Sequence, residues 1–253
     1  MSCLFFDLGN TRIKWWDGHK GGLLQYEGID QQMLALCEKH TPVSGVVFAS
    51  VVKDERRQRF LRSCRSVAGV PLFECLVTPA AAGVTCAYSD VQRLGIDRWL
   101  ALVAAWSTFG QSALVVDLGT AATFDFLGGD GTHQGGYILP GLRLGISGLL
   151  AGTSNIIVDQ DRLNAASLLP GKNTNDAVYH GAVAAMTATI ESSLARLKLN
   201  YPEAKLLLTG GDAELVGRQL GCHHEIRGQL VFEGMRLLHD HQLTKEVPLQ
   251  DIQ

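Results

Sequence analysis

The sequence predicts an α/β fold of two similar lobes, residues 1–112 and 113–253, with a cleft between them. The main observation is a repeated motif: an apolar run followed by Asp-Leu-Gly occurs at Asp7 and again at Asp117, once in each half of the chain. Short apolar runs typical of strands also alternate with segments of helical periodicity. No low-complexity linker separates the halves, so we expect the lobes to pack closely.

The first half is expected to open with a three-strand meander. Its first apolar run is too short for a helix and aromatic enough for a buried strand, and Asp17-Gly18 predicts a hairpin turn. Asp30 is expected to cap the first helix. We expect strands at 3–6, 13–16, 21–26, 46–52 and 70–77, helices at 30–40, 54–68 and 98–109, and a loop at 80–90.

The second half is expected to contain a strand, a glycine-rich hairpin and one long helix. Residues 173–176 are Asn-Thr-Asn-Asp, and these short polar side chains are typical helix caps. We expect strands at 113–118 and 205–208, the hairpin through 128–131, helices from 142, at 177–199, from 213 and at 231–238, an irregular stretch at 156–170 and a frayed polar tail after 240.

Composition limits the classes of partner. Hydrophobic residues make up 46% and charged residues 19% of the 253 residues, as in ordinary globular proteins. The net charge of −3 argues against a nucleic-acid partner, and no apolar run approaches the roughly 20 residues that span a bilayer. The six cysteines are scattered without a C-x-x-C pair. We therefore expect a cytoplasmic protein with reduced cysteines, no zinc site and no membrane partner.

The first Asp-Leu-Gly turn is suited to binding a polyphosphate. Asp7 ends a strand, Gly9 allows a tight turn with exposed N–H groups, and Asn10 and Thr11 add short polar side chains. Lys14 adds positive charge, and the carboxylate can hold Mg²⁺ through water. The alternative is an ordinary hairpin turn at the start of a sheet.

The second turn, at Asp117, repeats this pattern with Gly119 and Thr120. A third turn, Thr209-Gly210-Gly211, also follows an apolar run, and its two glycines leave room for an adenine ring or a ribose. Taken alone, this third turn is equally well explained as a tight strand–helix connection. Three such turns in order indicate a nucleotide site, and no Walker-type G-x-x-x-x-G-K-[ST] motif is present.

Asp97 is the candidate general base. It follows Gly95 at the start of a predicted helix, where the helix dipole favours the carboxylate, and it precedes Arg98, a planar donor suited to an acidic substrate. An ionised aspartate beside a substrate hydroxyl can accept its proton during attack on a γ-phosphate. The alternative is that Asp97 simply caps the helix.

A run of basic residues lies on the predicted helix 54–68. Apolar residues mark its opposite face, so we interpret the basic side as a solvated helix surface and not as a binding patch. The run comprises Lys53, Arg56, Arg57, Arg59, Arg62 and Arg65.

In combination, these motifs resemble those of type III pantothenate kinase. The resemblance covers residues 7–211 and includes Asp-Leu-Gly-Asn-Thr with Lys14, Gly-Ile-Asp-Arg at 95–98, Asp-Leu-Gly-Thr-Ala at 117–121 with Thr123 and Asp125, and the glycine-rich run 135–141. It implies an actin/hexokinase-like (ribonuclease H-like) fold and a homodimer. It also implies ATP-dependent phosphorylation of pantothenate, the first step towards coenzyme A.

The resemblance also implies roles for individual residues. Asp97 would be the general base, and Asp117 would bind a monovalent cation, K⁺ or NH₄⁺. ATP with its Mg²⁺ would be bound by Asp7, Leu8, Gly9, Asn10, Thr11, Arg12, Ile13, Lys14 and Thr120. Pantothenate would be bound by Tyr88, Gly95, Ile96, Asp97, Arg98 and Thr174.

Two rival functions stay open. A kinase of the same superfamily acting on a sugar or another small acid would use the same nucleotide site, although a single arginine beside Asp97 suits a carboxylate better than a sugar. A nucleotide-sensing regulator or chaperone-like ATPase would need a large partner-binding domain, for which 253 residues leave little room.

Overall fold

The structure, a computed structural model, describes residues 2–40, 42–67, 69–158 and 161–248. The chain forms two compact units: unit 1 comprises Met1–Ala104 and Leu230–Gln253, and unit 2 comprises Ala105–Gln229. The end of the chain therefore returns to the first unit. The lobe boundary expected between residues 112 and 113 stays a prediction. None of the helices in the described part of the chain is both long and apolar enough to cross a membrane.

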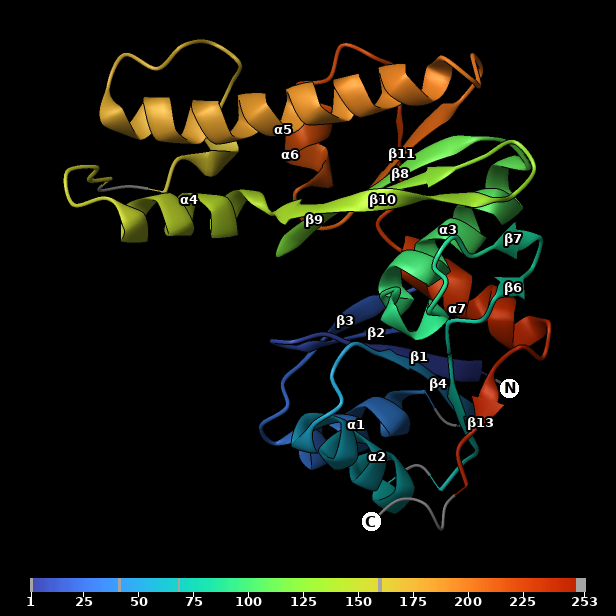
Figure 1. The fold of residues 1–253 in the computed structure, drawn as a ribbon. Helices are drawn as coiled ribbons and strands as arrows, with labels where there is room; N and C mark the ends of the chain where they lie inside the picture. Colours follow the sequence, from blue (N-terminus) through green and yellow to red (C-terminus); the bar gives the residue numbers. More distant parts are fainter. Residues whose placement is uncertain (1, 41, 68, 159–160, 249–253) are drawn as a thin grey trace. The chain divides into compact units, whose positions relative to one another are not determined.

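Unit 1 contains a six-stranded sheet in the order β13-β5-β4-β1-β2-β3 (Figure 1). Its strands are β1 Ser2–Leu8, β2 Ile13–Trp16, β3 Gly21–Leu24, β4 Val43–Ser50, β5 Leu72–Glu74 and β13 Lys245–Glu246. β1, β2 and β3 form an antiparallel meander, whereas β4 is parallel to β1 and β5 is parallel to β4. The carboxyl ends of the three parallel strands therefore meet at one edge of the sheet, and Asp7 lies at that edge.

Helices cover both faces of this sheet. Successive residues of β1 point to opposite sides, and the apolar residues Leu4, Phe5 and Phe6 are all buried, so each face packs against helices. The helices are α1 Ile29–Lys39, α2 Glu55–Val67, α7 Leu230–Asp240 and the first part of α3 Ile96–Phe109. α1 and α2 lie side by side in Figure 1, and on their face Phe6 packs against Phe60 with ring centroids 5.2 Å apart. On the other face Phe5 contacts Trp16, which contacts Phe232 of α7.

Unit 2 repeats the topology of unit 1. Its five-stranded sheet has the order β10-β9-β8-β11-β12, with an antiparallel meander and then β11 parallel to β8. The order matches β3-β2-β1-β4-β5 of unit 1, which confirms the predicted duplication at the level of strand topology. The strands are β8 Ala113–Leu118, β9 Ala121–Leu127, β10 His133–Pro140, β11 Lys205–Thr209 and β12 Glu225–Ile226.

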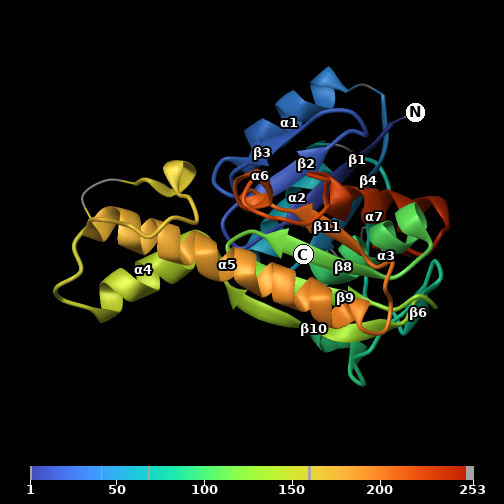
Figure 2. The ribbon, with the colours of Figure 1, turned by 90° about the horizontal axis from the view of Figure 1, so that it is seen from above.

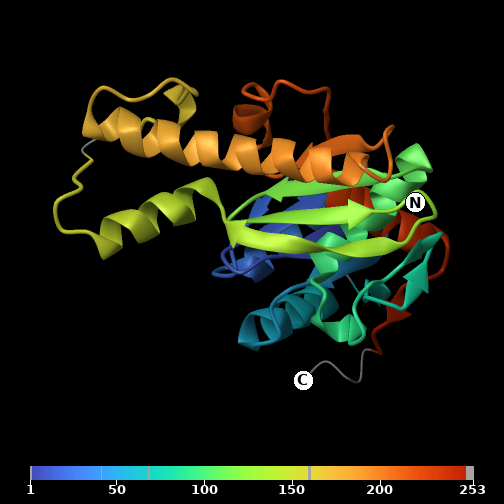
Figure 3. The same ribbon diagram turned by 45° about the horizontal axis from the view of Figure 1, so that its top comes forward.

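The long helix α5 covers one face of the unit 2 sheet, as the view from above shows (Figure 2). The helices of this unit are α4 Leu142–Gly152, α5 Thr174–Lys198 and the short α6 Ala213–Gly217. α4 lies beside the amino-terminal half of α5, and residues 153–173 connect the two (Figure 3). Within this connection the predicted irregular stretch 156–170 contains one short 3₁₀ helix, Leu163–Ala165, and residues 159–160 lie outside the described part.

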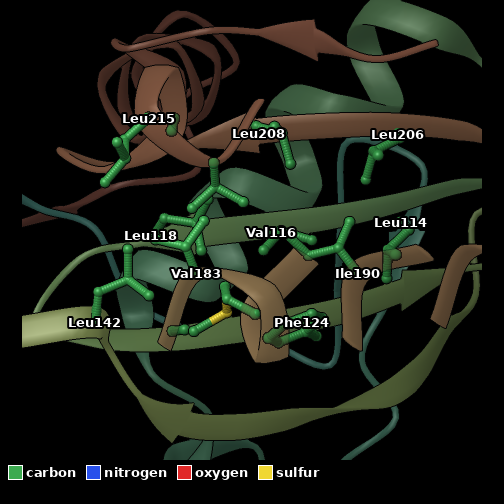
Figure 4. Close-up of a cluster of buried hydrophobic side chains, with 14 of the residues drawn as sticks. Leu114, Val116, Leu118, Phe124, Leu142, Val183, Ile190, Leu206, Leu208 and Leu215 are labelled. Carbon is green, nitrogen blue, oxygen red and sulfur yellow. The ribbon is translucent and has the colours of Figure 1, made fainter. Parts of the chain in front are cut away.

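The core of unit 2 lies between this sheet and α5 (Figure 4). Val116 of β8 and Phe124 of β9 are fully buried beneath Val183 and Ile190 of α5. Buried positions recur along α5 at intervals of three and four residues, which places them on one helix face. This packing fixes β8, and with it Asp117 near the carboxyl end of that strand.

Two predictions near helix and strand ends were wrong. Asp30 does not cap α1: the cap position is Gly28, whose φ of 64° suits glycine, and Asp30 lies inside the first turn. The strand expected at 70–77 is shortened to Leu72–Glu74, because only these residues pair with β4.

Two segments expected to be irregular contain paired strands. The predicted loop 80–90 holds a small hairpin of β6 (Ala80–Ala81) and β7 (Val84–Thr85). The tail expected to fray after Asp240 contains β13, which pairs with β5. Residues 249–253 of this tail lie outside the described part. Both pairings depend on partners that local sequence patterns do not reveal.

Candidate active site

Asp7 is a buried carboxylate at the strand-end edge of unit 1. It is 9% exposed and lies opposite Lys14 in the β1–β2 register, with its Oδ2 3.8 Å from Lys14 Nζ. Burial raises the pKa of Asp7 from 3.8 to about 6; the Lys14 ammonium lowers the pKa and the Asp97 carboxylate raises it. Asp7 and Asp97 are therefore close enough in unit 1 for their charges to interact, as the sequence hypothesis requires.

The turn after Asp7 presents a short polar surface. Gly9 donates its N–H to the Arg12 carbonyl at 3.2 Å, which closes the turn, and Asn10, Thr11 and Arg12 are exposed. Leu8 and Ile13, which the resemblance places among the ATP-binding residues, have fully buried side chains in the hydrophobic core. Only their backbone atoms could contact a nucleotide.

Asp97 is the second residue of α3, and its carboxylate turns back over the start of the helix. Its Oδ1 accepts the Arg98 N–H at 2.8 Å. An added Cβ at Gly95 would lie 2.5 Å from the same oxygen, so this conformation requires glycine at position 95. Asp97 therefore lies inside the first turn and is not a cap that precedes the helix. Its Oδ1 binds one N–H of that turn, whereas Oδ2 makes no hydrogen bond to any described residue and can accept a proton.

Arg98 is held in place beside Asp97 by Tyr88. The arginine is only 5% exposed, its Nη1 donates to the Tyr88 hydroxyl at 3.1 Å, and its guanidinium carbon lies 5.8 Å from the centre of that ring. A buried guanidinium with a fixed orientation is suited to binding a carboxylate through two parallel hydrogen bonds. The structure therefore brings together Tyr88, Asp97 and Arg98, as the sequence predicts.

A cavity of about 460 Å³ continues the strand-end edge beyond β4 and β5. Gly95 and Ile96 line it, together with Ser50, Arg57 and Glu74. Arg57 donates to Glu74 at 2.8 Å, so the two charges compensate each other inside the cavity. Sequence reasoning missed Ser50 and Glu74, although both end strands parallel to β1.

In unit 2, backbone packs closely around Asp117. Asp117 pairs in register with Thr209 of β11, and an added Cβ at Gly210 would lie 2.5 Å from Asp117 Oδ1. An added Cβ at Gly141 would lie 2.1 Å from the Gly119 carbonyl oxygen. The sequence singled out Gly210, but nothing local connects Gly141 with this turn.

Two further acids of unit 2 lie in the regions that the sequence motifs mark. Asp125, which belongs to the resembled motif, accepts a hydrogen bond from the buried His133 side chain at 2.9 Å and so joins β9 to β10. Asp212 follows the glycine turn, and burial raises its pKa while the positive charge of Arg143 lowers it.

Thr174, a predicted substrate residue, lies at the start of α5 in unit 2. It is the exposed first residue of α5, whose cap is Asn173, and it lines an apolar groove of about 830 Å³ between α4 and α5. Ile146 and Leu149 line the same groove. Across the described residues, no group of three or more His, Cys, Asp or Glu side chains could hold a metal ion.

The fold resembles that of several solved structures. A Campylobacter jejuni protein described provisionally as a Baf family transcriptional activator aligns with a TM-score of 0.62 and 22% identity, covering 95% of this chain and 99% of that one. A Sinorhizobium meliloti protein provisionally assigned as a 2-dehydro-3-deoxygalactonokinase aligns with a TM-score of 0.57 and 14% identity, covering 94% and 96%. The chain has the predicted actin/hexokinase-like α/β fold.

Sequence comparison identifies the family. The family model for type III pantothenate kinase matches residues 3–196. The type III pantothenate kinase of Chromohalobacter salexigens is 40% identical over 248 residues, covering 92% of this chain and 85% of that protein. The enzyme of the same name from Pseudomonas aeruginosa strain UCBPP-PA14 is 36% identical over 242 residues, covering 92% and 97%. The chain therefore belongs to the type III pantothenate kinase family.

Proposed function

We propose that this protein transfers the γ-phosphate of ATP to the primary hydroxyl of pantothenate, giving 4'-phosphopantothenate in the first step of coenzyme A biosynthesis. Membership of the type III pantothenate kinase family supports the reaction. The structural observation that carries it is the pair formed by Asp97, with one carboxylate oxygen unbonded, and Arg98, buried and oriented by Tyr88. We further propose a cytoplasmic location, as expected for this biosynthetic step.

Asp97 acts as the general base in this proposal. Its Oδ2 accepts the proton of the substrate hydroxyl as that oxygen attacks the γ-phosphorus, while Oδ1 stays bonded to the Arg98 N–H. Arg98 binds the pantothenate carboxylate, and Tyr88 keeps the guanidinium in position. Gly95 and Ile96 shape the start of α3 beside the substrate, and Thr174 contributes a further hydroxyl for binding it.

The turn after Asp7 binds the ATP phosphates. Asn10, Thr11 and Arg12 are exposed there, and the Lys14 ammonium adds positive charge. Leu8, Gly9 and Ile13 contribute backbone. Thr120, in the equivalent turn of unit 2, is the further ATP-binding residue that the family resemblance implies. Asp7 holds the Mg²⁺ that accompanies ATP, and the cation favours the ionised carboxylate that burial disfavours.

Asp117 is proposed to hold the monovalent cation, K⁺ or NH₄⁺. The fit rests on the cradle of backbone around its Oδ1, in which an added Cβ at Gly210 would lie 2.5 Å from that oxygen and 2.6 Å from the Leu118 backbone. An added Cβ at Gly119 would lie 3.5 Å from Asp117 Oδ1 and 3.6 Å from the Ala121 carbonyl oxygen, and hard cations prefer such oxygen ligands. When bound, the cation supplies positive charge that partly neutralises the phosphate chain.

We propose a homodimer formed through the α4–α5 face of unit 2. Leu149, which is 42% exposed, lines the apolar groove there, and Leu144 of the same helix is 50% exposed. A contiguous apolar surface of this kind is typical of a protein–protein interface. A second copy of the chain is the occupant that the family resemblance implies.

The reaction can be tested with purified protein, ATP, Mg²⁺ and K⁺. We expect ADP release only when pantothenate is added, and Asp97→Asn should reduce that release at least about a hundredfold while ATP still binds. Asp90→Asn is the matched control. Asp90 is an exposed acid that caps the short 3₁₀ helix Val91–Arg93, and asparagine can replace it as a cap. Release of ADP with a sugar instead of pantothenate would support the sugar-kinase rival, and no ADP release with any small acid would support the regulator.

A further inference from the structure

Two side chains from outside the turn hold the carbonyl groups of residues 9 and 10. The Tyr26 hydroxyl donates to the Gly9 carbonyl at 2.7 Å, and Arg56 Nη1 donates to the Asn10 carbonyl. Tyr26 precedes α1 and Arg56 belongs to the first turn of α2. The turn is thus fixed by contacts that neither strand of its own hairpin supplies.

These contacts determine where the turn's N–H groups point. In a planar trans peptide the C=O and the following N–H point in opposite directions. When the Gly9 and Asn10 carbonyls face Tyr26 and Arg56, the N–H groups of Asn10 and Thr11 must face away from them. Neither N–H makes a hydrogen bond to another described residue, so both can bind an anion.

Tyr26 and Arg56 also support each other. The Arg56 guanidinium carbon lies 5.8 Å from the centre of the Tyr26 ring, and its Nε and Nη2 donate to Asp54 at 3.0 and 2.6 Å. Burial raises the pKa of Tyr26 to about 12, so the phenol keeps its proton and stays a donor at neutral pH.

In the second copy of the motif, a backbone N–H and not a side chain donates to the equivalent carbonyl. Aligning Asp117 with Asp7 places Gly119 opposite Gly9 and Thr120 opposite Asn10. There the Gly141 N–H donates to the Thr120 carbonyl at 3.0 Å. A donor from outside the turn therefore restrains the same carbonyl position in both units.

We propose that Tyr26 and Arg56, here called the turn clamp, are positioning residues that orient the Asn10 and Thr11 N–H groups for the ATP phosphates. This role of the turn clamp rests on the proposed function, since the clamp affects catalysis only if this turn binds ATP. It assigns to Arg56 a role other than the solvated helix surface expected from the sequence.

The test compares Tyr26→Phe and Arg56→Gln with Arg62→Gln. Tyr26→Phe removes one oxygen and no charge. Arg62→Gln is the matched control because it breaks an exposed ion pair with Glu55 on the same helix. We expect the KM for ATP to rise about fivefold in Tyr26→Phe and about tenfold in Arg56→Gln, with kcat, the KM for pantothenate and the melting temperature nearly unchanged. Arg56→Lys, which retains a donor, should recover part of the loss.

Hydrogen exchange of the peptide spanning residues 8–14, measured without nucleotide, gives a second readout. Exchange should be faster in both clamp variants and unchanged in Arg62→Gln. Three results in the clamp variants would each refute the proposal. These are faster exchange with an unchanged KM for ATP, an equal rise in the KM for ATP and the KM for pantothenate, and unchanged exchange. If the wild-type protein itself does not bind ATP, the proposed function fails and the clamp's nucleotide role fails with it. If the wild-type protein binds ATP and the clamp variants bind it equally well, the positioning role of Tyr26 and Arg56 is refuted and the proposed function is not.

Discussion

Asp7→Asn should make the protein more stable and inactive at the same time. The pKa of Asp7 rises from 3.8 to about 6 on folding, chiefly through burial. At about 1.4 kcal/mol per pKa unit, ionised Asp7 lowers the free energy of unfolding by roughly 3 kcal/mol above pH 6. Asparagine preserves the size and polarity of the side chain but carries no charge, so the variant avoids that loss.

The pH dependence makes this prediction specific. Well below pH 3.8 the carboxyl group is protonated in both folded and unfolded chains, and Asp7 has no such effect. As pH rises from 3.8 to about 6 the unfolded chain ionises first, so the wild-type protein loses stability that the variant keeps. The advantage of Asp7→Asn should therefore be roughly 1.5 kcal/mol at pH 5 and roughly 3 kcal/mol at pH 8.

Urea unfolding at these two pH values, without nucleotide or Mg²⁺, measures the difference. In a thermal scan at pH 8 the melting temperature should rise by roughly 6–12 °C. Glu203→Gln, which changes an exposed carboxylate in the turn before β11, should have no comparable effect. An advantage equal at both pH values, or a variant less stable than wild type at pH 8, would refute the assignment of a buried, destabilising charge to Asp7.

Three further changes probe the other proposed sites. Gly210→Ala should lower the free energy of unfolding by at least about 2 kcal/mol in urea titrations, because φ is +93° and the added Cβ would lie 2.5 Å from Asp117 Oδ1. Activation by K⁺ should also weaken. A variant as stable as the wild-type protein would contradict the close packing. Arg98→Lys should raise the KM for pantothenate at least about tenfold in steady-state assays and leave the KM for ATP nearly unchanged, since lysine cannot donate two parallel hydrogen bonds. An equal rise in both KM values would argue against a contact between Arg98 and the pantothenate carboxylate. Leu149→Lys should convert the proposed dimer to a monomer in light scattering, and an unchanged mass would exclude this face.

The strands and turns that carry the acids were predictable because their signals are local. A buried apolar run followed by Asp-Leu-Gly predicts a strand and a tight turn without reference to the rest of the chain, and β1 and β8 both follow it. The Asp97–Arg98 pair was predictable for the same reason. Its neighbours in sequence already place it at the start of a helix.

Contacts between distant segments could not be predicted in this way. The Arg56 contact with Asn10 spans 46 residues, and its helix periodicity alone indicates a solvated side chain. β13 pairs with the edge strand β5, and Gly141 lies beside the Asp117 turn because β10 pairs with β9. In each case the deciding partner lies in another element, whose position only the fold determines.

The two Asp-Leu-Gly turns are held by different contacts, so substitutions should affect them unequally. In unit 1 the carbonyls of the turn are bonded by side chains, Tyr26 and Arg56, which can be shortened or exchanged one donor at a time. In unit 2 the same task falls to the main chain at Gly141, where any side chain would overlap the Gly119 carbonyl oxygen. Substitutions can therefore alter the first turn one donor at a time, whereas any side chain at Gly141 would disturb the second turn.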